Sequence, residues 1–318
     1  MVNGSPFKGN SALVTRLLLV FLFAVWSISF TAIGHLRRIF TPMELVGARF
    51  LPVMIFCLCY LLLGRARRRE TVTVFRTAPF RFLGMGLCGV AAYNFFLYLG
   101  QSEIKPGAAA LITTLSPLLT LVLAIPFLKE RAPARRIAGI ILAFAGLYFV
   151  VQWGKVGMGN VAGIGHPEVK YALITSLAPL SWTFYTILAK DLVRERSPLT
   201  VTYISLVIGT IPFLFVIDGQ FLHTLIHMGH THWLALFHLS VMSTLIGFWI
   251  WVTALRRLPA TEVASYIYLN PPFAALFGWL LFAEEITGFF LLGSAVVLLG
   301  LYLSQSDKKS LPPKRVLR

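Results

Sequence analysis

The chain has 318 residues, of which 57% are hydrophobic and 13% are charged, with a mean hydropathy of +0.79 and a formal net charge of +16. A soluble domain of this length cannot enclose so much apolar surface in one core, so the composition excludes a soluble globular protein. The positive charge alone would fit a nucleic-acid partner, but its distribution along the chain excludes that interpretation.

Ten apolar runs follow one another, each close to the roughly 20 residues that a helix needs to cross the hydrocarbon core of a bilayer. They predict an all-α integral membrane protein with ten transmembrane helices. The predicted spans are 14–34, 43–63, 80–100, 107–127, 136–153, 170–190, 199–217, 233–255, 262–282 and 287–304. The connections are short, so we expect no extramembrane domain, and the lipid bilayer is the first partner.

Lysine and arginine are unevenly distributed between the two sides of these spans. The segments on the side of the N-terminus hold 22 of the 28, the opposite side holds five, and Arg49 lies within a span. Acidic residues divide evenly, so only the cations are sorted, which puts both termini in the cytoplasm. The run 65–69 is therefore interpreted as a topology anchor, with recognition of lipid headgroups as the alternative.

The same residues recur at fixed spacing in the two halves of the chain. Pro117, Glu130, Gly139, Gly146 and Tyr148 match, 154 residues later, Pro271, Glu284, Gly293, Gly300 and Tyr302. A repeat of this period indicates two copies of one structural unit. We expect a first five-helix repeat over 1–155, a second over 170–305 and a basic cytoplasmic tail over 306–318.

Five helices per copy is an odd number, so the second copy enters the membrane from the opposite side. Inverted repeats of this kind are typical of secondary transporters, which bind their substrate near the midplane between the repeats. The alternative is that duplication merely produced a stable bundle. Small residues in the fifth helix of each copy, such as Gly139 and Gly300, are expected to let helices pack closely.

The motifs also resemble a known family. Leu115-Ser116-Pro117 and Leu128-Lys129-Glu130 recur as Leu269-Asn270-Pro271 and Phe282-Ala283-Glu284, and Trp26 and Arg49-Phe50 precede them. This pattern is similar to the EamA-type family of the drug/metabolite transporter superfamily. The resemblance implies ten helices in inverted repeats and export of small metabolites, such as amino acids, or of drugs. Ser205 stands where the second copy would match Arg49, so the substrate subfamily stays open.

Pro117 and Pro271 are predicted to break the fourth helix of each copy. Proline removes a backbone hydrogen bond, and in a bilayer the freed groups must be satisfied by neighbours or by a polar cavity. We therefore expect these two helices to line a cavity and to act as hinges there. The alternative is a static kink that serves packing.

Aromatic, amide and hydroxyl groups gather at mid-depth and are the candidate substrate-binding residues. An amide in hydrocarbon needs a partner, and aromatic walls with a few polar groups suit small, partly apolar zwitterions or organic cations. The alternative for each residue is an interhelical hydrogen bond without a ligand. The candidates are Trp26, Tyr93, Asn94, Ser116, Trp182, Tyr185, Trp249, Tyr266 and Asn270.

Arg49 is the basic residue set within a span. Insertion there costs about 2–3 kcal/mol unless the side chain reaches the interface or finds a partner. It is expected either to hold a substrate carboxylate or to play a structural role, by binding carbonyls of a broken helix or by pairing with Glu44.

Two further groups of titratable residues have structural interpretations. Glu130 and Glu284 each end a proline-containing helix and are expected to cap or bridge a neighbouring helix. His223, His227, His230 and His232 cluster in an external connection, where spacings of four and three could suggest a metal site. We interpret them as an interfacial loop and expect no metal and no cofactor.

Together these features predict a secondary transporter of the cell inner membrane, not an enzyme. It would export small metabolites, most simply amino acids or related compounds, by alternating access. The alternatives are a multidrug, organic-cation or purine exporter of the same fold, or a membrane-embedded enzyme or channel. We found no nucleophile, carboxylate pair or filter loop that would favour the last two. The oligomeric state stays open.

Overall fold

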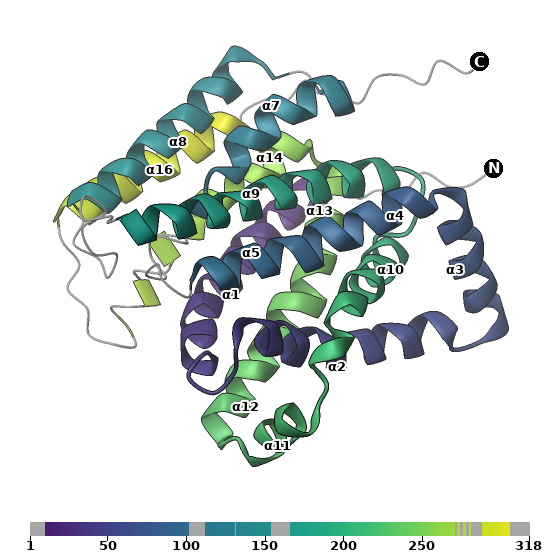
Figure 1. The fold of residues 1–318 in the computed structure, drawn as a ribbon. Helices are drawn as coiled ribbons and strands as arrows, with labels where there is room; N and C mark the ends of the chain where they lie inside the picture. Colours follow the sequence, from purple (N-terminus) through teal and green to yellow (C-terminus); the bar gives the residue numbers. More distant parts are fainter. Residues whose placement is uncertain are drawn as a thin grey trace, which may run out of the picture.

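The protein is helical throughout the part that the computed structural model describes, namely residues 10–101, 112–130, 132–153, 166–270, 272–273, 276–277, 280 and 288–305. The helices, labelled as in Figure 1, are α1 (Asn10–Leu36), α2 (Pro42–Leu62), α3 (Arg65–Thr77), α4 (Pro79–Gly86), η1 (Leu87–Ala92), α5 (Tyr93–Gly100), α7 (Ser116–Leu128), α8 (Ala134–Trp153), α9 (His166–Leu192), α10 (Pro198–Thr210), η3 (Ile211–Val216), α11 (Gly219–His227), α12 (His230–Phe237), η4 (His238–Ile246), α13 (Gly247–Arg257), α14 (Ala260–Ser265), η5 (Tyr266–Leu269) and α16 (Gly288–Gln305).

Among the described residues, five continuous helical stretches are long and apolar enough to cross a membrane. They are Ala12–Leu36, Pro42–Leu62, Pro79–Gly100, Pro198–Val216 and His230–Arg257, and they coincide with five of the predicted spans. Helices α7, α8, α9 and α16 overlap the fourth, fifth, sixth and tenth predicted spans, and α14 covers the start of the ninth. The number of ten transmembrane helices stays a prediction, because parts of the fourth and ninth predicted spans lie outside the described residues.

Helix starts follow the local sequence chemistry. Thr41 Oγ1 accepts a hydrogen bond from Glu44 N at 3.3 Å, and Glu44 Oε2 accepts one from Thr41 N at 2.7 Å, so the two residues form a capping box around Pro42. The alternative that Glu44 pairs with Arg49 is therefore wrong. The carboxylate of Glu44 is occupied at the start of α2, one turn before Arg49.

The two halves share irregular segments at the same repeat positions. Helix η1 is a π-helical segment, and the shift of 154 residues places it on 241–246, inside the π-helical segment η4. Likewise, the turn at Thr114–Leu115 before α7 corresponds to residues 268–269, within the 3₁₀ segment η5. The break thus lies directly before Pro117, the second residue of α7. Pro271 itself lies outside the described residues.

Helices α8 and α16 lie side by side along one side of the molecule (Figure 1). Their backbones approach at glycines: a Cβ at Gly139 would lie 2.5 Å from Ser304 N, and one at Gly300 would overlap Ala143 N. Where lipid is as apolar as the side chains, such close contact is what associates helices. The expectation that these small residues serve packing is confirmed for Gly139 and Gly300.

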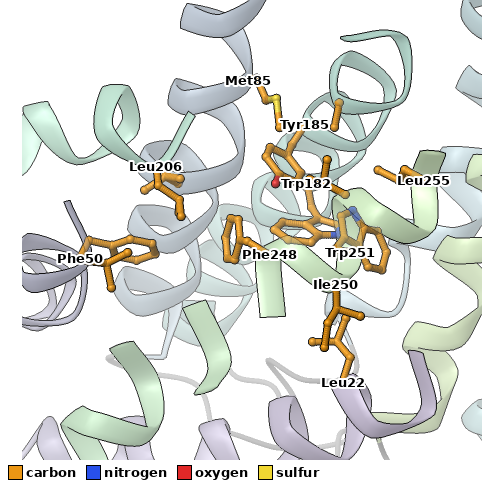
Figure 2. Close-up of a cluster of buried hydrophobic side chains, with 14 of the residues drawn as sticks. Leu22, Phe50, Met85, Trp182, Tyr185, Leu206, Phe248, Ile250, Trp251 and Leu255 are labelled. Atoms are coloured by element: carbon orange, nitrogen blue, oxygen red, sulfur yellow. The ribbon is translucent and has the colours of Figure 1, made fainter. Parts of the chain in front are cut away.

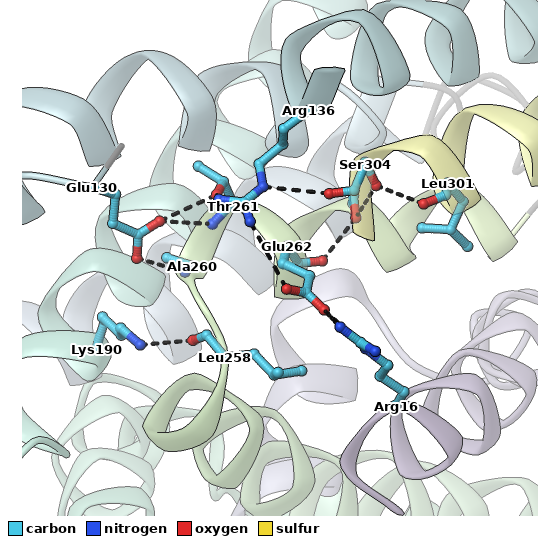
Figure 3. Close-up of polar contacts among 11 residues, drawn as sticks. Arg16, Glu130, Arg136, Lys190, Leu258, Ala260, Thr261, Glu262, Leu301 and Ser304 are labelled. Atoms are coloured by element: carbon cyan, nitrogen blue, oxygen red, sulfur yellow. Dashed lines mark hydrogen bonds and ion pairs between the residues drawn. The ribbon is translucent and has the colours of Figure 1, made fainter. Parts of the chain in front are cut away.

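A polar network joins the two halves at one end of the bundle (Figure 3). Glu130 accepts hydrogen bonds from Ala260 N at 2.7 Å and from Thr261 N at 3.3 Å, so it caps the start of α14. Arg16 donates from Nε and Nη2 to Glu262 Oε1 at 3.0 and 2.9 Å. The predicted capping role of Glu130 is confirmed, and its partner is the ninth predicted span. Glu284 lies outside the described residues.

Arg136 completes this network from α8. Its Nε donates to Ser304 O and its Nη1 to Thr261 Oγ1, both at 3.3 Å, and its Nη2 lies 4.0 Å from Glu262 Oε2. Arg136 and Glu262 are 2% and 3% exposed. Charges so deeply buried need partners, and here the partners come from the opposite half of the chain.

Substituting Gly300 by Val should destabilise the protein, because the added side chain meets the backbone of α8. We expect a loss of at least about 1–3 kcal/mol, the usual cost of overpacking. The matched control is Gly34→Val in α1, where a Cβ meets nothing within 4 Å. Thermal unfolding midpoints in detergent test the pair, and equal midpoints would show that the α8–α16 contact is not tight.

Candidate functional site

A cavity lies at the middle of the bundle between the two halves. The centre of a water-sized sphere can reach about 60 Å³ of it. Both halves supply its walls. The residues lining it are Trp26, Ser29, Phe30, Ile33, Arg49, Tyr93, Asn94, Leu97, Thr113, Ser116, Trp182, Ser243, Phe248, Ile267 and Asn270.

Most of the candidate substrate-binding residues come together in this wall. Six of the nine line the cavity, namely Trp26, Tyr93, Asn94, Ser116, Trp182 and Asn270. Arg49 lines it as well. These residues are far apart in the sequence, and the fold brings them around one cavity.

Three candidates lie elsewhere. Tyr185 is fully buried behind the wall, where its ring stacks on Trp182 at 4.9 Å between centroids. Trp249 is 36% exposed on the outside of α13. Tyr266 is buried in η5 beside the Arg16–Glu262 pair rather than at the cavity. Each has the expected depth along its helix but faces another direction.

The cavity wall follows the repeat more closely than the candidate set did. The shift of 154 residues pairs Thr113 with Ile267 and Ser116 with Asn270, and all four line the cavity. At Pro106 and Pro259 the shift is 153 residues, so Asn94 pairs with Gly247, next to the lining residue Phe248. Phe248 and Ile267 are apolar and did not stand out by residue type. Applying the repeat shift to Thr113 would have found Ile267.

Aromatic rings pack together in and behind the cavity wall, and Figure 2 shows Trp182 close to Tyr185, Phe248 and Trp251. Trp182 is at their centre: its ring centroid lies 5.4 Å from Trp26, 5.1 Å from Tyr93, 5.4 Å from Phe248 and 5.2 Å from Trp251. Most of these contacts are edge-on or tilted, the arrangements that aromatic quadrupoles favour. The packed rings give the cavity an apolar, shape-defined surface at mid-depth.

The two repeat-related tryptophans differ in their hydrogen bonds. Trp26 Nε1 donates to Ser243 O at 2.9 Å, a carbonyl within the π-helical segment η4. Trp182 Nε1 is buried and has no acceptor within the described part of the chain. Trp26 is thereby fixed against the opposite half, whereas Trp182 is held by ring packing.

Arg49 of α2 places a positive charge in the cavity wall, and the residue is only 6% exposed. Its Nε donates to Thr244 Oγ1 at 2.7 Å, its Nη1 to Tyr98 Oη at 2.8 Å and its Nη2 to Ser243 Oγ at 3.1 Å. Asn94 Oδ1 lies 3.5 Å from Nη1. All four partners are neutral side chains, so they orient the guanidinium without neutralising it. Instead of the expected carbonyls of a broken helix, Arg49 contacts side-chain hydroxyls of η4.

The amides in the wall also have protein partners. Asn94 Nδ2 donates to Val90 O at 2.8 Å, in η1. Asn270 accepts from Ser27 Oγ at its main-chain O, at 3.1 Å, and at Oδ1, at 3.3 Å. These bonds satisfy part of each amide's capacity and fix its direction, which is how polar groups are held ready for a ligand in an apolar pocket.

The external histidines are divided between two helices. His223 and His227 stack at 4.1 Å in α11, whereas His230 and His232 belong to α12, and His232 stacks on His35 of α1 at 4.4 Å. Within the described residues, no three His, Cys, Asp or Glu side chains come close enough to share a metal ion. The spacings of four and three do not place the first three histidines on one helical face, because the helix is interrupted at residues 228–229 between α11 and α12.

Comparison with known proteins identifies relatives over nearly the whole chain. Residues 14–152 and 169–305 each match the EamA-like transporter family. An uncharacterized transporter of Archaeoglobus fulgidus is 28% identical over 87% of this chain and 94% of its own. The probable amino-acid metabolite efflux pump of Escherichia coli is 27% identical over 90% and 93%. The probable terminal-alkyne amino-acid exporter of Streptantibioticus cattleyicolor is 26% identical over 69% and 70%.

A solved crystal structure has the same fold. It superposes with a TM-score of 0.70 at 17% identity, covering 93% of this chain and 96% of that chain. The family matches occupy most of each half and agree with the shared irregular segments. The chain therefore belongs to the EamA-like transporter family and is a multi-pass protein of the cell inner membrane.

Proposed function

We propose that this transporter exports amino acids or closely related carboxylate-bearing metabolites by alternating access. Ten transmembrane helices would form two inverted five-helix repeats over 1–155 and 170–305, with both termini and the tail 306–318 in the cytoplasm. The sorting of lysine and arginine supports this orientation. The shared breaks in the third and fourth predicted spans of each half support the repeat.

The observation that carries the substrate class is the charge of Arg49 in an aromatic wall. A guanidinium held by four neutral side chains keeps its full positive charge, and in a cavity of low polarity that charge attracts an anion strongly. Trp182 and Phe248 would receive the apolar part of the same molecule. Two relatives are named as a probable amino-acid metabolite efflux pump and a probable amino-acid exporter, which agrees with this class.

The same charge disfavours export of organic cations, the first alternative within this fold. A cation in the cavity would gain from the aromatic faces but would be repelled by Arg49. Neutral purines would stack on the rings and accept hydrogen bonds from the guanidinium, but they bring no negative charge to it. The substrate screen should therefore pair each amino acid with its decarboxylated amine and include purines.

Counterflow from proteoliposomes tests this proposal directly. Vesicles loaded with an unlabelled amino acid should accumulate the labelled compound transiently, and the decarboxylated amine should not replace it. A channel would give no stimulation by unlabelled substrate on the other side. Preferred counterflow of amines or purines would assign the protein to one of the alternatives.

Replacing Arg49 by Met should abolish discrimination between an amino acid and its amine. An ionic hydrogen bond contributes about 1.5–3 kcal/mol, so we expect at least a tenfold fall in the ratio of the two transport rates. Arg49→Lys keeps the charge but not the planar fork, and should retain part of the ratio. A purely structural Arg49 would lower both rates together and leave the ratio unchanged.

The tryptophans give a matched test of the aromatic wall. Trp182→Ala should lower amino-acid transport at least about tenfold, because a buried ring that touches a ligand contributes on the order of 2 kcal/mol. Trp249→Ala removes the same side chain from the outer surface and should change the rate by less than about twofold. Both variants are compared at equal amounts of protein in the membrane. Equal losses would place Trp182 outside the binding site.

The polar network at the Arg16 end is the proposed inner gate. Its bonds from Arg16, Glu130 and Arg136 all run from the first half to residues of the second, such as Thr261 and Glu262. Opening the cavity toward the cytoplasm would require these bonds to part. The network would therefore stabilise the outward-facing state relative to the inward-facing state.

Glu262→Gln should shift the balance toward the inward-facing state, because two arginines lose their carboxylate partner. The reactivity of a cysteine introduced at Ser265 toward a water-soluble reagent added from the inside should rise several-fold. Asp191→Asn is the control, since it removes the surface pair of Arg81 and Asp191, 2.5 Å apart, at the same end. Unchanged reactivity in Glu262→Gln would exclude the gate.

A further inference from the structure

Helix α3 stands apart from the other helices of the bundle. In Figure 1 it crosses the end of the molecule between α2 and α4 and runs across the ends of both. Both of those elements belong to predicted spans, so a helix across their ends lies parallel to the membrane surface. The proposed orientation places it on the cytoplasmic side.

One narrow face of α3 fastens it to the bundle. The guanidinium of Arg67 lies 4.1 Å from the ring centroid of Tyr60, and its Nη1 donates to Tyr60 O at 3.4 Å. Thr71 Oγ1 reaches Leu61 O at 3.4 Å, and Val74 packs against the core. Arg67, Thr71 and Val74 recur at helical spacing, so they form one stripe. At the C-terminal end of α3, Thr77 Oγ1 accepts a hydrogen bond from Arg196 at 2.8 Å and the ring of Phe75 lies 6.1 Å from that of Phe82.

The remaining four arginines of α3 gather on one flank. With about 100° per residue, Arg65, Arg68, Arg69 and Arg76 fall within a sector of roughly 100° beside the fastening stripe. All four are exposed. In the described part of the chain, no acidic group lies within ion-pairing distance of any of them. This arginine flank is a concentrated positive surface.

Apolar side chains share the arginine flank. Val72 is 42% exposed and Phe75 37%, and both fall in or next to the same sector. Phe80, at the start of α4, is 85% exposed. A helix that combines arginines with exposed apolar residues on one flank suits the boundary between headgroups and acyl chains. There, the arginine stems extend along the chains while the guanidinium groups reach the phosphates.

We propose that the arginine flank of α3 is a binding site for anionic phospholipid headgroups of the cytoplasmic leaflet. The phosphates would accept hydrogen bonds from Arg65, Arg68, Arg69 and Arg76, and Val72 and Phe75 would enter the acyl region. The site thus adds lipid recognition to the transport function and does not depend on which substrate is carried. Arginine suits this role because its planar fork matches two phosphate oxygens.

Competitive lipid retention measures the site on the intact protein. Purified protein is equilibrated with equal amounts of phosphatidylglycerol and phosphatidylcholine of matched chains, and the bound lipids are counted by native mass spectrometry. Each arginine near an anionic surface contributes about fivefold in affinity. We therefore expect at least a tenfold preference for phosphatidylglycerol at low salt, falling steeply as salt is raised.

The variant R65Q/R68Q/R69Q/R76Q should lose this preference, and the corresponding fourfold Lys variant should keep most of it. The control R81Q/R194Q/R256Q/R257Q removes the same charge from the same end outside α3, and should keep the preference. If the Gln variant fails to fold, the wild-type preference and its salt dependence still decide the matter.

Two results would overturn the proposal. One is wild-type protein that retains both lipids equally, or a Gln variant that retains as much phosphatidylglycerol as the wild type. The other is displacement of the lipid by glycerol phosphate at equal concentration, which would assign the flank to soluble phosphates. Neither result bears on amino-acid counterflow, so a failure here is distinct from a failure of the proposed transport function.

Discussion

The structure depends on one constraint, which is that main-chain polar groups at mid-depth in a membrane must find partners within the protein. Both halves interrupt two helices there, and each interruption frees carbonyl groups. Side chains supply partners: Trp26 Nε1 donates to Ser243 O and Ser116 Oγ to Thr113 O. Both donors line the cavity, so residues that satisfy the breaks also shape its wall.

The same breaks position Arg49. Its hydroxyl partners Ser243 and Thr244 belong to η4, where the π-helical geometry lets Thr244 Oγ1 also reach Leu239 O, five residues back, at 2.8 Å. A buried guanidinium is costly, and neutral partners reduce that cost without cancelling the charge. In the proposed function, an anionic substrate would therefore meet a positive charge that is already oriented. The segment η4 of the second half fixes the position of a charge that the first half contributes.

Much of this architecture could be predicted from residue patterns. Apolar run lengths located the helices, and the repeated Pro117 and Glu130 positions located a break and a cap, because each reflects chemistry local to its helix. The direction in which a side chain faces is different. Tyr185, Trp249 and Tyr266 sit at suitable depths but point away from the cavity, since that direction depends on how neighbouring helices pack. In a helix that is apolar all round, periodicity does not record it.

Contacts between the two halves could not be predicted from local sequence patterns either, as the partners of Glu262 show. Arg16, Arg136 and Glu262 are far apart in the sequence, and the spacing of each alone indicates only a charged helix end. Their meeting depends on the arrangement of the halves, which no local pattern contains. Phe248 and Ile267 escaped notice for a simpler reason. Both are apolar, and in a membrane protein an apolar side chain does not distinguish a cavity wall from a helix contact or a lipid-facing surface.

The glycine contact between α8 and α16 has a mechanical consequence. Each half contributes one of these two helices, and their backbones already touch at Gly139 and Gly300, so the halves cannot approach further along this line. In the proposed alternating access, the halves would turn about this contact. Turning about a fixed line widens one end of the cavity while it narrows the other, so the contact would keep the two mouths from being open together.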